Sequence, residues 1–328
     1  MHTAPPYRVA QMIEGSAPRK RSPLRGPSRP GPTRAASQPV RVSGLQGVWF
    51  GREAAVATKH GKESVLVPPL EAQVGLRLDV PPGIDTDIFG TFDGSTPRQG
   101  TLREAAVAKA TYGAELAHAE LGIASEGAYG SPPTRPFVSG GMEGLVLVDR
   151  ELEITVVEHM IVDEPVFASE TVEAGDALEP VLQRAGFPSH ALMIGVDLSP
   201  EHTEWLRTGL HDREELTTSI AKLFRAGEGP VRLASDMRAD RNPSRMRAIA
   251  ELADRFAVRL ATNCPECGIG GFGWVAYRRG LPCEACGGAS TLVHGEVHGC
   301  AKCEHTVELG RKDGRRTAGV QDCPACHP

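Results

Sequence analysis

Four cysteine pairs of the form C-x-x-C mark the C-terminal end of this 328-residue chain. The first two pairs are separated by 15 residues and the last two by 19. Both spacings are typical of zinc ribbons, in which two short turns supply four thiolates to one metal ion. The pairs contain every cysteine of the sequence: Cys264, Cys267, Cys283, Cys286, Cys300, Cys303, Cys323 and Cys326. Two zinc sites are therefore predicted within residues 264–328.

The sequence leaves the pairing of these turns open. Joining the first pair to the second, and the third to the fourth, gives one zinc ion per ribbon and is the simplest assignment. Cross-bracing of the pairs is an alternative, as is replacement of a cysteine by His294, His298, His305 or His327. Four thiolates leave no open coordination position, so both zinc ions are expected to be structural. Disulfide or redox chemistry is the competing interpretation, which cysteines confined to paired turns disfavour.

The ribbon segment carries no strong signal for nucleic-acid binding. Residues 264–328 contain seven basic and seven acidic residues, and each zinc–tetrathiolate centre adds negative charge. Phe272, Trp274 and Tyr277 could stack on bases, but small ribbons usually use such side chains in their own core. The stretch GIGGFG matches a dinucleotide fingerprint but follows a cysteine turn instead of a strand, which excludes that function. Nucleic acid is thus a possible partner that the sequence does not favour.

The first 44 residues differ in composition from the rest of the chain. Residues 1–44 hold eight basic residues and one acidic residue among many prolines, glycines and serines. Such a segment cannot bury enough apolar surface to fold, so a disordered basic tail is predicted. A basic arm that touches polyphosphate or nucleic acid is the alternative. The remainder carries a formal charge of −12, which argues against broad electrostatic binding of nucleic acid.

Neither a membrane anchor nor an export signal is visible in the sequence. No stretch approaches the roughly 18 consecutive apolar residues of a membrane-spanning helix. The N-terminal basic residues are not followed by the apolar segment of a secretory signal. We therefore expect a cytoplasmic protein that does not bind membranes.

Residues 45–263 alternate between strand-like and helix-like stretches, which predicts an α/β domain with a mixed sheet flanked by helices and one buried core. Expected strands cover residues 54–58, 76–80, 121–125, 145–149, 152–162, 190–196 and 231–235. Expected helices cover residues 101–120 and lie near 176–185, 213–226 and 243–261. The strands at 145–149 and 152–162 are predicted to form a hairpin.

Polar residues gather where predicted strands give way to helices. Residues 58–63 form a basic glycine loop in which Thr58, His60 and Lys62 are candidate phosphate ligands. Residues 85–94 form an acidic, glycine-bounded loop. Residues 235–246 place Arg238, Arg241 and Arg245 around a helix N-terminus, where an anion would be favoured. The alternative for these arginines is pairing with Asp236 and Asp240.

Two glutamates are candidate catalytic residues. Glu104 follows Thr101 in a T-x-x-E capping box, so capping its own helix is a complete alternative explanation. Glu126, in the stretch GIASEG, comes at the predicted end of an apolar strand, where no capping role exists. Its alternative is simple surface exposure.

The chain resembles two protein families. From Ala54 onward it resembles a bacterial family of unknown function, through the motifs HGKE, DTDIFGTFDG, GIASEGAYG, SDMRADRNPSRM and NCPECGIGGFG. Residues 54–135 are also similar to inosine/xanthosine triphosphate pyrophosphatases, through TLREAAVAKA followed by LGIASEGAYG. The second resemblance implies an α/β fold and hydrolysis of nucleoside triphosphates.

The pyrophosphatase resemblance implies roles for individual residues. Lys62 would contact phosphate, Lys109 would neutralise polyphosphate, and Glu104 and Glu126 would bind or position Mg²⁺. The sequence departs from that family in two places. The helix asparagine is Ala105, and the acidic pair before glycine is Ser125-Glu126. A metal-binding carboxylate is therefore missing or comes from elsewhere, with Asp85 and Asp87 as candidates.

These observations predict an Mg²⁺-dependent nucleotide phosphohydrolase carrying two structural zinc ribbons. Metal and Lys or Arg side chains would balance the charge that develops on the leaving pyrophosphate. The alternative is a non-catalytic zinc-ribbon module that recognises a nucleotide, nucleic acid or protein partner. The expected catalytic residues are Glu104, Glu126 and Lys62. The expected phosphate-binding residues are Thr58, His60, Lys62, Lys109, Arg238 and Arg245.

Overall fold

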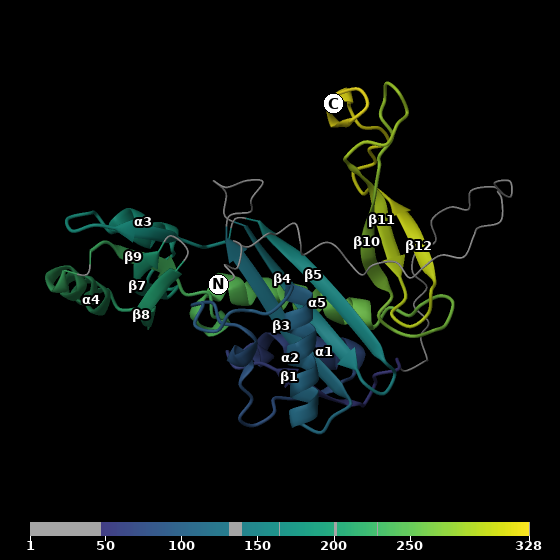
Figure 1. Ribbon diagram of the computed structural model, residues 1–328. Coiled ribbons are helices and arrows are strands. Elements are labelled where there is room, and N and C mark those ends of the chain that lie inside the picture. The colour runs from purple at the N-terminus through teal and green to yellow at the C-terminus, as the bar shows by residue number, and fades with distance from the viewer. Residues whose placement is uncertain (1–46, 131–139, 164, 200–201, 228, 328) are drawn as a thin grey trace.

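The computed structural model describes residues 47–130, 140–163, 165–199, 202–227 and 229–327. These residues form three sheets, shown in Figure 1: a central five-stranded sheet, a four-stranded sheet on one side and a three-stranded ribbon on the other. The predicted tail, residues 1–44, lies outside the described part. No helix among the described residues has the length and apolar character needed to cross a membrane.

The central sheet is mixed, as predicted. Its strand order is β2-β1-β3-β4-β5. Strand β1 runs parallel to both β2 and β3, whereas β3, β4 and β5 are antiparallel neighbours. The predicted hairpin is therefore present as β4 and β5. The strands are β1 (Glu53–Ala57), β2 (Arg77–Asp79), β3 (Leu121–Gly130), β4 (Gly140–Asp149) and β5 (Ile154–Asp163).

Helices cover both faces of this sheet. Alternate residues of a strand point to opposite faces. Val56 and Ile123 accordingly join the core beneath α1 (Glu63–Val74) and α5 (Pro243–Leu260), while Ala57 and Ala124 pack against α2 (Leu102–Leu116). The result is a three-layer α/β/α arrangement.

Helix α2 lies unusually close to the sheet because small residues line the contact. A Cβ atom on Gly122 would lie 1.9 Å from the carbonyl oxygen of Ala110. A Cβ on Gly113 would lie 2.9 Å from Cβ of Ala57. Ala106 and Ala110 are fully buried in the same contact. This close packing fixes Lys109 of α2 directly above the sheet.

The chain connections create a crevice at the carboxyl ends of β1 and β2. The loop after β1 leads to α1 on one face, and the loop after β2 leads through the short 3₁₀ helix η2 (Thr86–Phe89) to α2 on the other. In open α/β sheets, ligands bind where neighbouring strands send their connections to opposite faces. The loop at residues 58–63 lies at this point.

The second sheet was not expected as a separate unit. Its order is β6-β9-β7-β8, all antiparallel, and it buries its own apolar cluster with α3 and α4. The prediction of one core for residues 45–263 is therefore corrected to separate clusters. Strands β6 and β8 were missed because their largely exposed edge positions give little hydrophobic alternation. The elements are β6 (Ser169–Val172), α3 (Glu179–Arg184), β7 (Leu192–Ser199), β8 (His202–Leu210), α4 (Arg213–Ala226) and β9 (Val231–Ser235).

The C-terminal ribbon packs against the central sheet at one end only. A Cβ on Gly270 would lie 2.9 Å from the ring of buried Trp49, and one on Gly271 would lie 2.7 Å from Val156. The glycines of GIGGFG therefore allow the first cysteine turn to approach the domain. Lys302 Nζ also donates to the carbonyl oxygen of Leu152 at 2.6 Å. The ribbon strands are β10 (Gly273–Arg279), β11 (Val293–Gly299) and β12 (Thr306–Gly310), and two further 3₁₀ helices are η3 (Ala239–Arg241) and η4 (Val320–Asp322).

Candidate metal centres and anion-binding cavity

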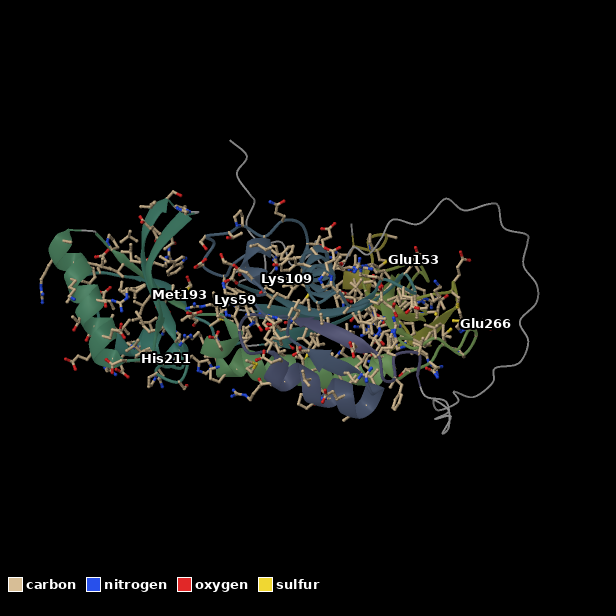
Figure 2. The ribbon with its side chains drawn as sticks, turned by 90° about the horizontal axis from the view of Figure 1, so that it is seen from below. Lys59, Lys109, Glu153, Met193, His211 and Glu266 are labelled. Atoms are coloured by element: carbon tan, nitrogen blue, oxygen red, sulfur yellow. The ribbon has the colours of Figure 1, made fainter. Side chains whose placement is uncertain are left out.

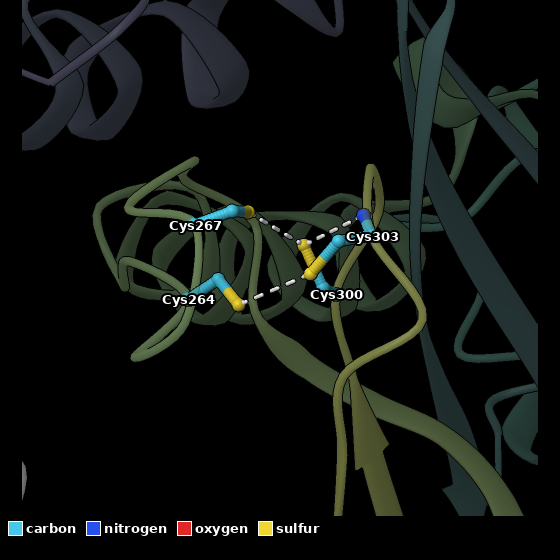
Figure 3. A group of neighbouring side chains, drawn as sticks. All are labelled: Cys264, Cys267, Cys300 and Cys303. Carbon is cyan, nitrogen blue, oxygen red and sulfur yellow. Dashed lines mark hydrogen bonds between the residues drawn. The ribbon is translucent and has the colours of Figure 1, made fainter.

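The eight cysteines gather into two groups of four. Cys264 and Cys267 meet Cys300 and Cys303 in the first tetrad, which Figure 3 shows. The second tetrad contains Cys283, Cys286, Cys323 and Cys326. All eight are free thiols, so disulfides are not formed.

The geometry of both tetrads fits zinc. Four sulfur atoms at about 2.3 Å from a tetrahedral zinc ion lie about 3.8 Å apart. In the first tetrad, Cys264 and Cys303 have their Sγ atoms 3.8 Å apart, and Cys267 and Cys300 have theirs 3.5 Å apart. The corresponding distances in the second tetrad are 3.9 and 3.6 Å. Two structural zinc sites are supported by this donor set.

The simplest sequence-based pairing was wrong, and the alternative of cross-bracing is what the structure has. The first cysteine pair joins the third, and the second joins the fourth. The cause is the antiparallel sheet, because each of β10, β11 and β12 carries the chain from one end of the ribbon to the other. Successive pairs therefore fall at opposite ends. No histidine belongs to either group in the described part of the chain.

A small polar cavity lies in the crevice between the central and second sheets. Its volume is about 80 Å³. In Figure 2, Lys109 lies over the central sheet and Met193 lies on the second sheet, with Lys59 between them. The cavity is lined by His60, Lys62, Thr86, Asp87, Gly90, Thr91, Phe92, Asp93, Arg98, Lys109, Glu126, Gly127, Met193, Asp236, Arg238 and Arg245.

Lys62 is the least compensated charge of the cavity. Its side chain is buried, and its Nζ atom donates to Ser125 Oγ at 2.9 Å. Within the described residues it forms no ion pair with a carboxylate. Burial lowers the pKa of Lys62 to about 7, and the nearby charges of Arg245 and Lys109 act in the same direction, against Glu143 and Glu126. An ammonium in this position favours an anionic ligand.

Glu126 is held by two cations. Lys109 Nζ lies 2.5 Å from one carboxylate oxygen and Arg98 Nη1 lies 3.0 Å from the other. Burial alone would raise the pKa of this carboxyl, but the neighbouring cations, Lys109 foremost among them, together more than offset it, so the pKa lies below its ordinary value. The predicted strand end at Ser125 is corrected, because β3 continues to Gly130 opposite β4. Glu126 is thus a buried residue inside the strand.

A second buried ion pair adjoins the first. Arg245 Nε donates to Glu143 Oε1 at 2.6 Å, and Tyr129 donates its hydroxyl to the same oxygen at 2.7 Å. The guanidinium of Arg245 also lies over the Phe92 ring, 4.3 Å from its centroid. Gly127 makes room for this arrangement, since a Cβ there would lie 2.5 Å from Glu143 Oε1.

We expect Gly127→Ala to destabilise the protein by about 1–3 kcal/mol, because the added methyl group overlaps a buried ion pair that cannot move into solvent. Urea unfolding followed by circular dichroism measures the change. Gly310→Ala is the matched control, since a Cβ at that strand position meets nothing within 4 Å. Equal stability of the two variants would show that the pair around Gly127 repacks without cost.

The other predicted residues differ in whether they reach the cavity. Glu104 closes the capping box of α2 with Thr101 and does not line the cavity. Thr58 also lies outside the lining, and its buried hydroxyl has no hydrogen-bond partner among the described residues. His60 lines the cavity between Asp87 and Asp240, with nitrogen–oxygen distances of 3.3 and 3.5 Å.

The arginines of residues 235–246 are paired. Arg238 binds the buried carboxylate of Asp236, and Arg241 lies 3.3 Å from Asp240, as the sequence-based alternative predicted. Arg245 instead pairs with Glu143 across the domain. Arg238 and Arg245 both line the cavity.

The cavity carboxylates do not form a ready-made magnesium site. Glu126 is bound to Lys109 and Arg98, and the candidates Asp85 and Asp87 both contact Lys59, at 3.0 and 2.7 Å. In the described part of the chain, the groups of three or more His, Cys, Asp or Glu side chains that lie close enough to share a metal ion are the two cysteine tetrads. The residues present therefore do not fit a preformed Mg²⁺ shell.

Sequence reasoning missed Arg98, Tyr129 and Glu143. An acid within the apolar stretch of residues 142–148 is a signal that could have identified Glu143, because a buried charge needs a partner. Arg98 lies in a loop without a recognisable pattern.

Comparison with known proteins places the chain in a family. A family model described as a domain of unknown function (DUF6671) matches residues 109–328, more than half of the chain. The chain belongs to the DUF6671 family. No curated protein and no solved structure matches it significantly. The predicted membership in a family of unknown function agrees with this result, while the pyrophosphatase resemblance stays a prediction.

The DUF6671 match includes both tetrads and part of the cavity. Lys109, Glu126 and Arg245 lie within the matched residues, whereas Lys62 and Arg98 precede them. The DUF6671 segment therefore contains the second sheet, the ribbon and one wall of the cavity.

Proposed function

We propose that the cavity binds a phosphate-bearing nucleotide and that the protein hydrolyses it. The observation that carries this proposal is Lys62, a buried cation whose Nζ atom, among the residues that the structure describes, donates to a hydroxyl, Ser125 Oγ, and pairs with no carboxylate. Burying a charge is costly unless it is paired. An anionic ligand would supply the missing partner at the crevice where α/β sheets bind their ligands.

The neighbouring groups suit a phosphate. Lysine offers three donors as a point charge, and arginine offers a planar fork that matches phosphate oxygens. Lys62 lies at the N-cap of α1, which has no side-chain cap, so the helix dipole also favours an anion there. Lys109, Arg98 and Arg245 bring further positive charge to the same cavity.

The proposed hydrolysis uses this chain's own residues. Phosphate oxygens would take over hydrogen bonds from Lys109 and Arg98, which now hold Glu126. The released carboxylate of Glu126 would then orient the attacking water and accept its proton, while the water oxygen bonds to phosphorus and the bond from phosphorus to the leaving phosphate breaks. Lys62 would stabilise the negative charge that develops on the leaving phosphate. Binding of Mg²⁺ and a cytoplasmic location both remain predictions.

A second candidate is binding without turnover, by a module whose ribbon contacts another partner. The observation favouring it is that Glu126, Asp87 and Asp236 are each already bound to a cation. Glu104, the other predicted catalytic acid, lies outside the cavity lining.

A panel of nucleoside triphosphates, including those of inosine and xanthosine, separates the two candidates. Purified protein is incubated with each nucleotide and Mg²⁺ while pyrophosphate and phosphate release are measured. If the protein hydrolyses the nucleotide, we expect turnover, and Glu126→Gln should lower the turnover rate by about 100-fold or more. This is the size expected for a group that acts in proton transfer. Nucleotide binding with no turnover supports the second candidate, and absence of both contradicts the whole proposal.

A further inference from the structure

A second hollow of the molecule lies beside the cavity. It is an apolar groove between the first turn of α1 on one side and η3 and the first two turns of α5 on the other. Helices α1 and α5 pack side by side over the same face of the central sheet. The volume of the groove is about 380 Å³. Its apolar lining residues are Val65, Ala239, Pro243, Met246 and Ala250.

The groove and the cavity are separated by one contact between two side chains. His60 lines the cavity and Asp240 lines the groove. His60 Nδ1 lies 3.5 Å from a carboxylate oxygen of Asp240. Lys62 lies in the cavity at the N-cap of α1, and Val65 lies in the groove within the next turn of the same helix. A ligand with a phosphate at Lys62 therefore reaches the groove by extending past the His60–Asp240 contact.

The two spaces differ in size, and they suit different parts of one ligand. The cavity, at about 80 Å³, falls well below the roughly 300–1,000 Å³ of pockets that enclose a whole small molecule. It has room for a compact group such as phosphate, so the remainder of a nucleotide must lie outside it. The groove falls within the range of small-molecule pockets.

Two charged side chains of opposite sign complete the groove. The side chain of Asp240 is 38% exposed, and a carboxylate has about four acceptor positions, of which its contacts with His60 and Arg241 use only part. Arg247 is exposed and donates to Ser244 Oγ through one nitrogen, while a guanidinium has five donors. The groove therefore offers apolar walls together with both a hydrogen-bond acceptor and a hydrogen-bond donor.

We propose that the apolar groove binds the nucleobase of a nucleotide whose phosphates occupy the cavity. This inference rests on the proposed function and adds a second site to it. A nucleobase has two apolar faces and an edge of donors and acceptors, which match the walls and the two charged groups. The thioether of Met246 and the guanidinium of Arg247 both make favourable contacts with aromatic rings.

Other small ligands match the groove less well. A sugar would place hydroxyl groups against the apolar walls, where their hydrogen bonds to water would be lost. A hydrocarbon chain would leave Asp240 and Arg247 without a polar partner on the ligand. A planar heteroaromatic ring avoids both costs.

Calorimetric titration of the full chain at pH 7, without added Mg²⁺, compares purine and pyrimidine nucleoside triphosphates with inorganic tripolyphosphate. These ligands share the phosphate chain, so a difference in affinity measures the contribution of the rest of the nucleotide. We expect the tightest nucleotide to bind at least about tenfold more tightly than tripolyphosphate, because a base stacked on protein side chains contributes binding free energy of that order. Tripolyphosphate that binds as tightly as every nucleotide would overturn the inference.

Filling the groove assigns the base to it. Ala250→Phe places a ring inside the groove and should lower the affinity for the nucleotide by about tenfold, to the affinity for tripolyphosphate. Binding of tripolyphosphate should not change, which also shows that the cavity is intact. Ala226→Phe is the matched control, because Ala226 is exposed at the end of α4 and does not line the groove. Equal losses in both variants, or no loss in Ala250→Phe, would overturn the assignment.

Arg247→Ala tests the groove without introducing bulk near the core, and it decides the question if Ala250→Phe does not fold. Arg247 is exposed, so the variant should keep its fold. We expect the affinity for the nucleotide to fall by about threefold or more and the affinity for tripolyphosphate to stay the same. Unchanged binding of both ligands, or equal loss of both, would overturn the position of the base beside Arg247.

A second pair of variants separates failure of this inference from failure of the proposed function. Lys62→Met should weaken nucleotide and tripolyphosphate alike by about tenfold or more. Lys222→Met removes one lysine from α4, away from the cavity lining, and should weaken neither. Binding of tripolyphosphate that depends on Lys62, without any preference for nucleotides, would overturn the groove and leave the phosphate cavity standing. Absence of binding by every phosphate ligand would overturn both.

Discussion

Replacing Cys264 with serine should unfold much of the protein, whereas replacing Cys283 should leave the α/β part folded. The first tetrad lies against the domain core, where Gly270 contacts Trp49 and Ile269 packs on the same cluster. The second tetrad lies at the far end of the ribbon (Figure 1). Structural zinc contributes about 10–16 kcal/mol in zinc-finger peptides, comparable with the roughly 5–15 kcal/mol stability of a whole domain.

Metal content and thermal unfolding together test this asymmetry. We expect about two zinc ions per chain in the wild type and about one in each variant, because each tetrad holds a single ion. The unfolding temperature should fall strongly for Cys264→Ser and little for Cys283→Ser. A ratio near zero in anaerobically prepared wild-type protein would refute both zinc sites, and equal losses of stability would refute the asymmetry.

Replacement of Lys62 by an apolar residue should change the stability of the protein. Lys62→Met is expected to stabilise the ligand-free protein at pH 6 by roughly 1–4 kcal/mol, the range seen when buried ion pairs are replaced by apolar residues of similar volume. At this pH the lysine is protonated in both the folded and unfolded states, so its full burial cost is present. The same variant should lose phosphate binding.

The pH dependence of this gain follows from the lowered pKa. Folded Lys62 has a pKa of about 7, while the pKa of the unfolded residue keeps its ordinary value of 10.5. As pH rises between these values the folded lysine is neutral and the unfolded one is still charged. The stability of the wild type therefore rises with pH, and the advantage of the variant shrinks toward pH 10.5.

Thermal unfolding at about pH 6 and pH 9, on either side of the lowered pKa, with and without inorganic phosphate, measures both effects. Phosphate should raise the unfolding temperature of the wild type and of Lys222→Met but not that of Lys62→Met. A variant that is less stable than the wild type at pH 6 without phosphate would mean that Lys62 has a structural partner. That result would remove the main support for an anion site.

The sequence predicted elements with strong local signals. The capping box at Thr101 and Glu104, the helix beginning at Pro243 and the β4–β5 hairpin all appear where expected. Each depends on neighbouring residues, so local chemistry is sufficient to predict it. The cysteine spacing likewise predicted the zinc donors.

Features set by distant contacts escaped prediction. The cysteine pairing follows from the three ribbon strands, and recognising β10 and β11 would have shown that alternate pairs share an end. Glu126 was expected at a strand end, but its position is set by pairing of β3 with β4, where it lies opposite Gly144. The positive charges of Lys109 and Arg245 that act on Lys62 come from distant parts of the sequence, which no local pattern connects to it.

A crystal structure grown with inorganic phosphate, at a concentration that saturates binding in solution, tests the central claim most directly. We expect one phosphate in the crevice, with an oxygen about 3 Å from Lys62 Nζ and others within reach of Lys109 and Arg245. An empty cavity, or phosphate bound only on the ribbon or another surface, would contradict the claim.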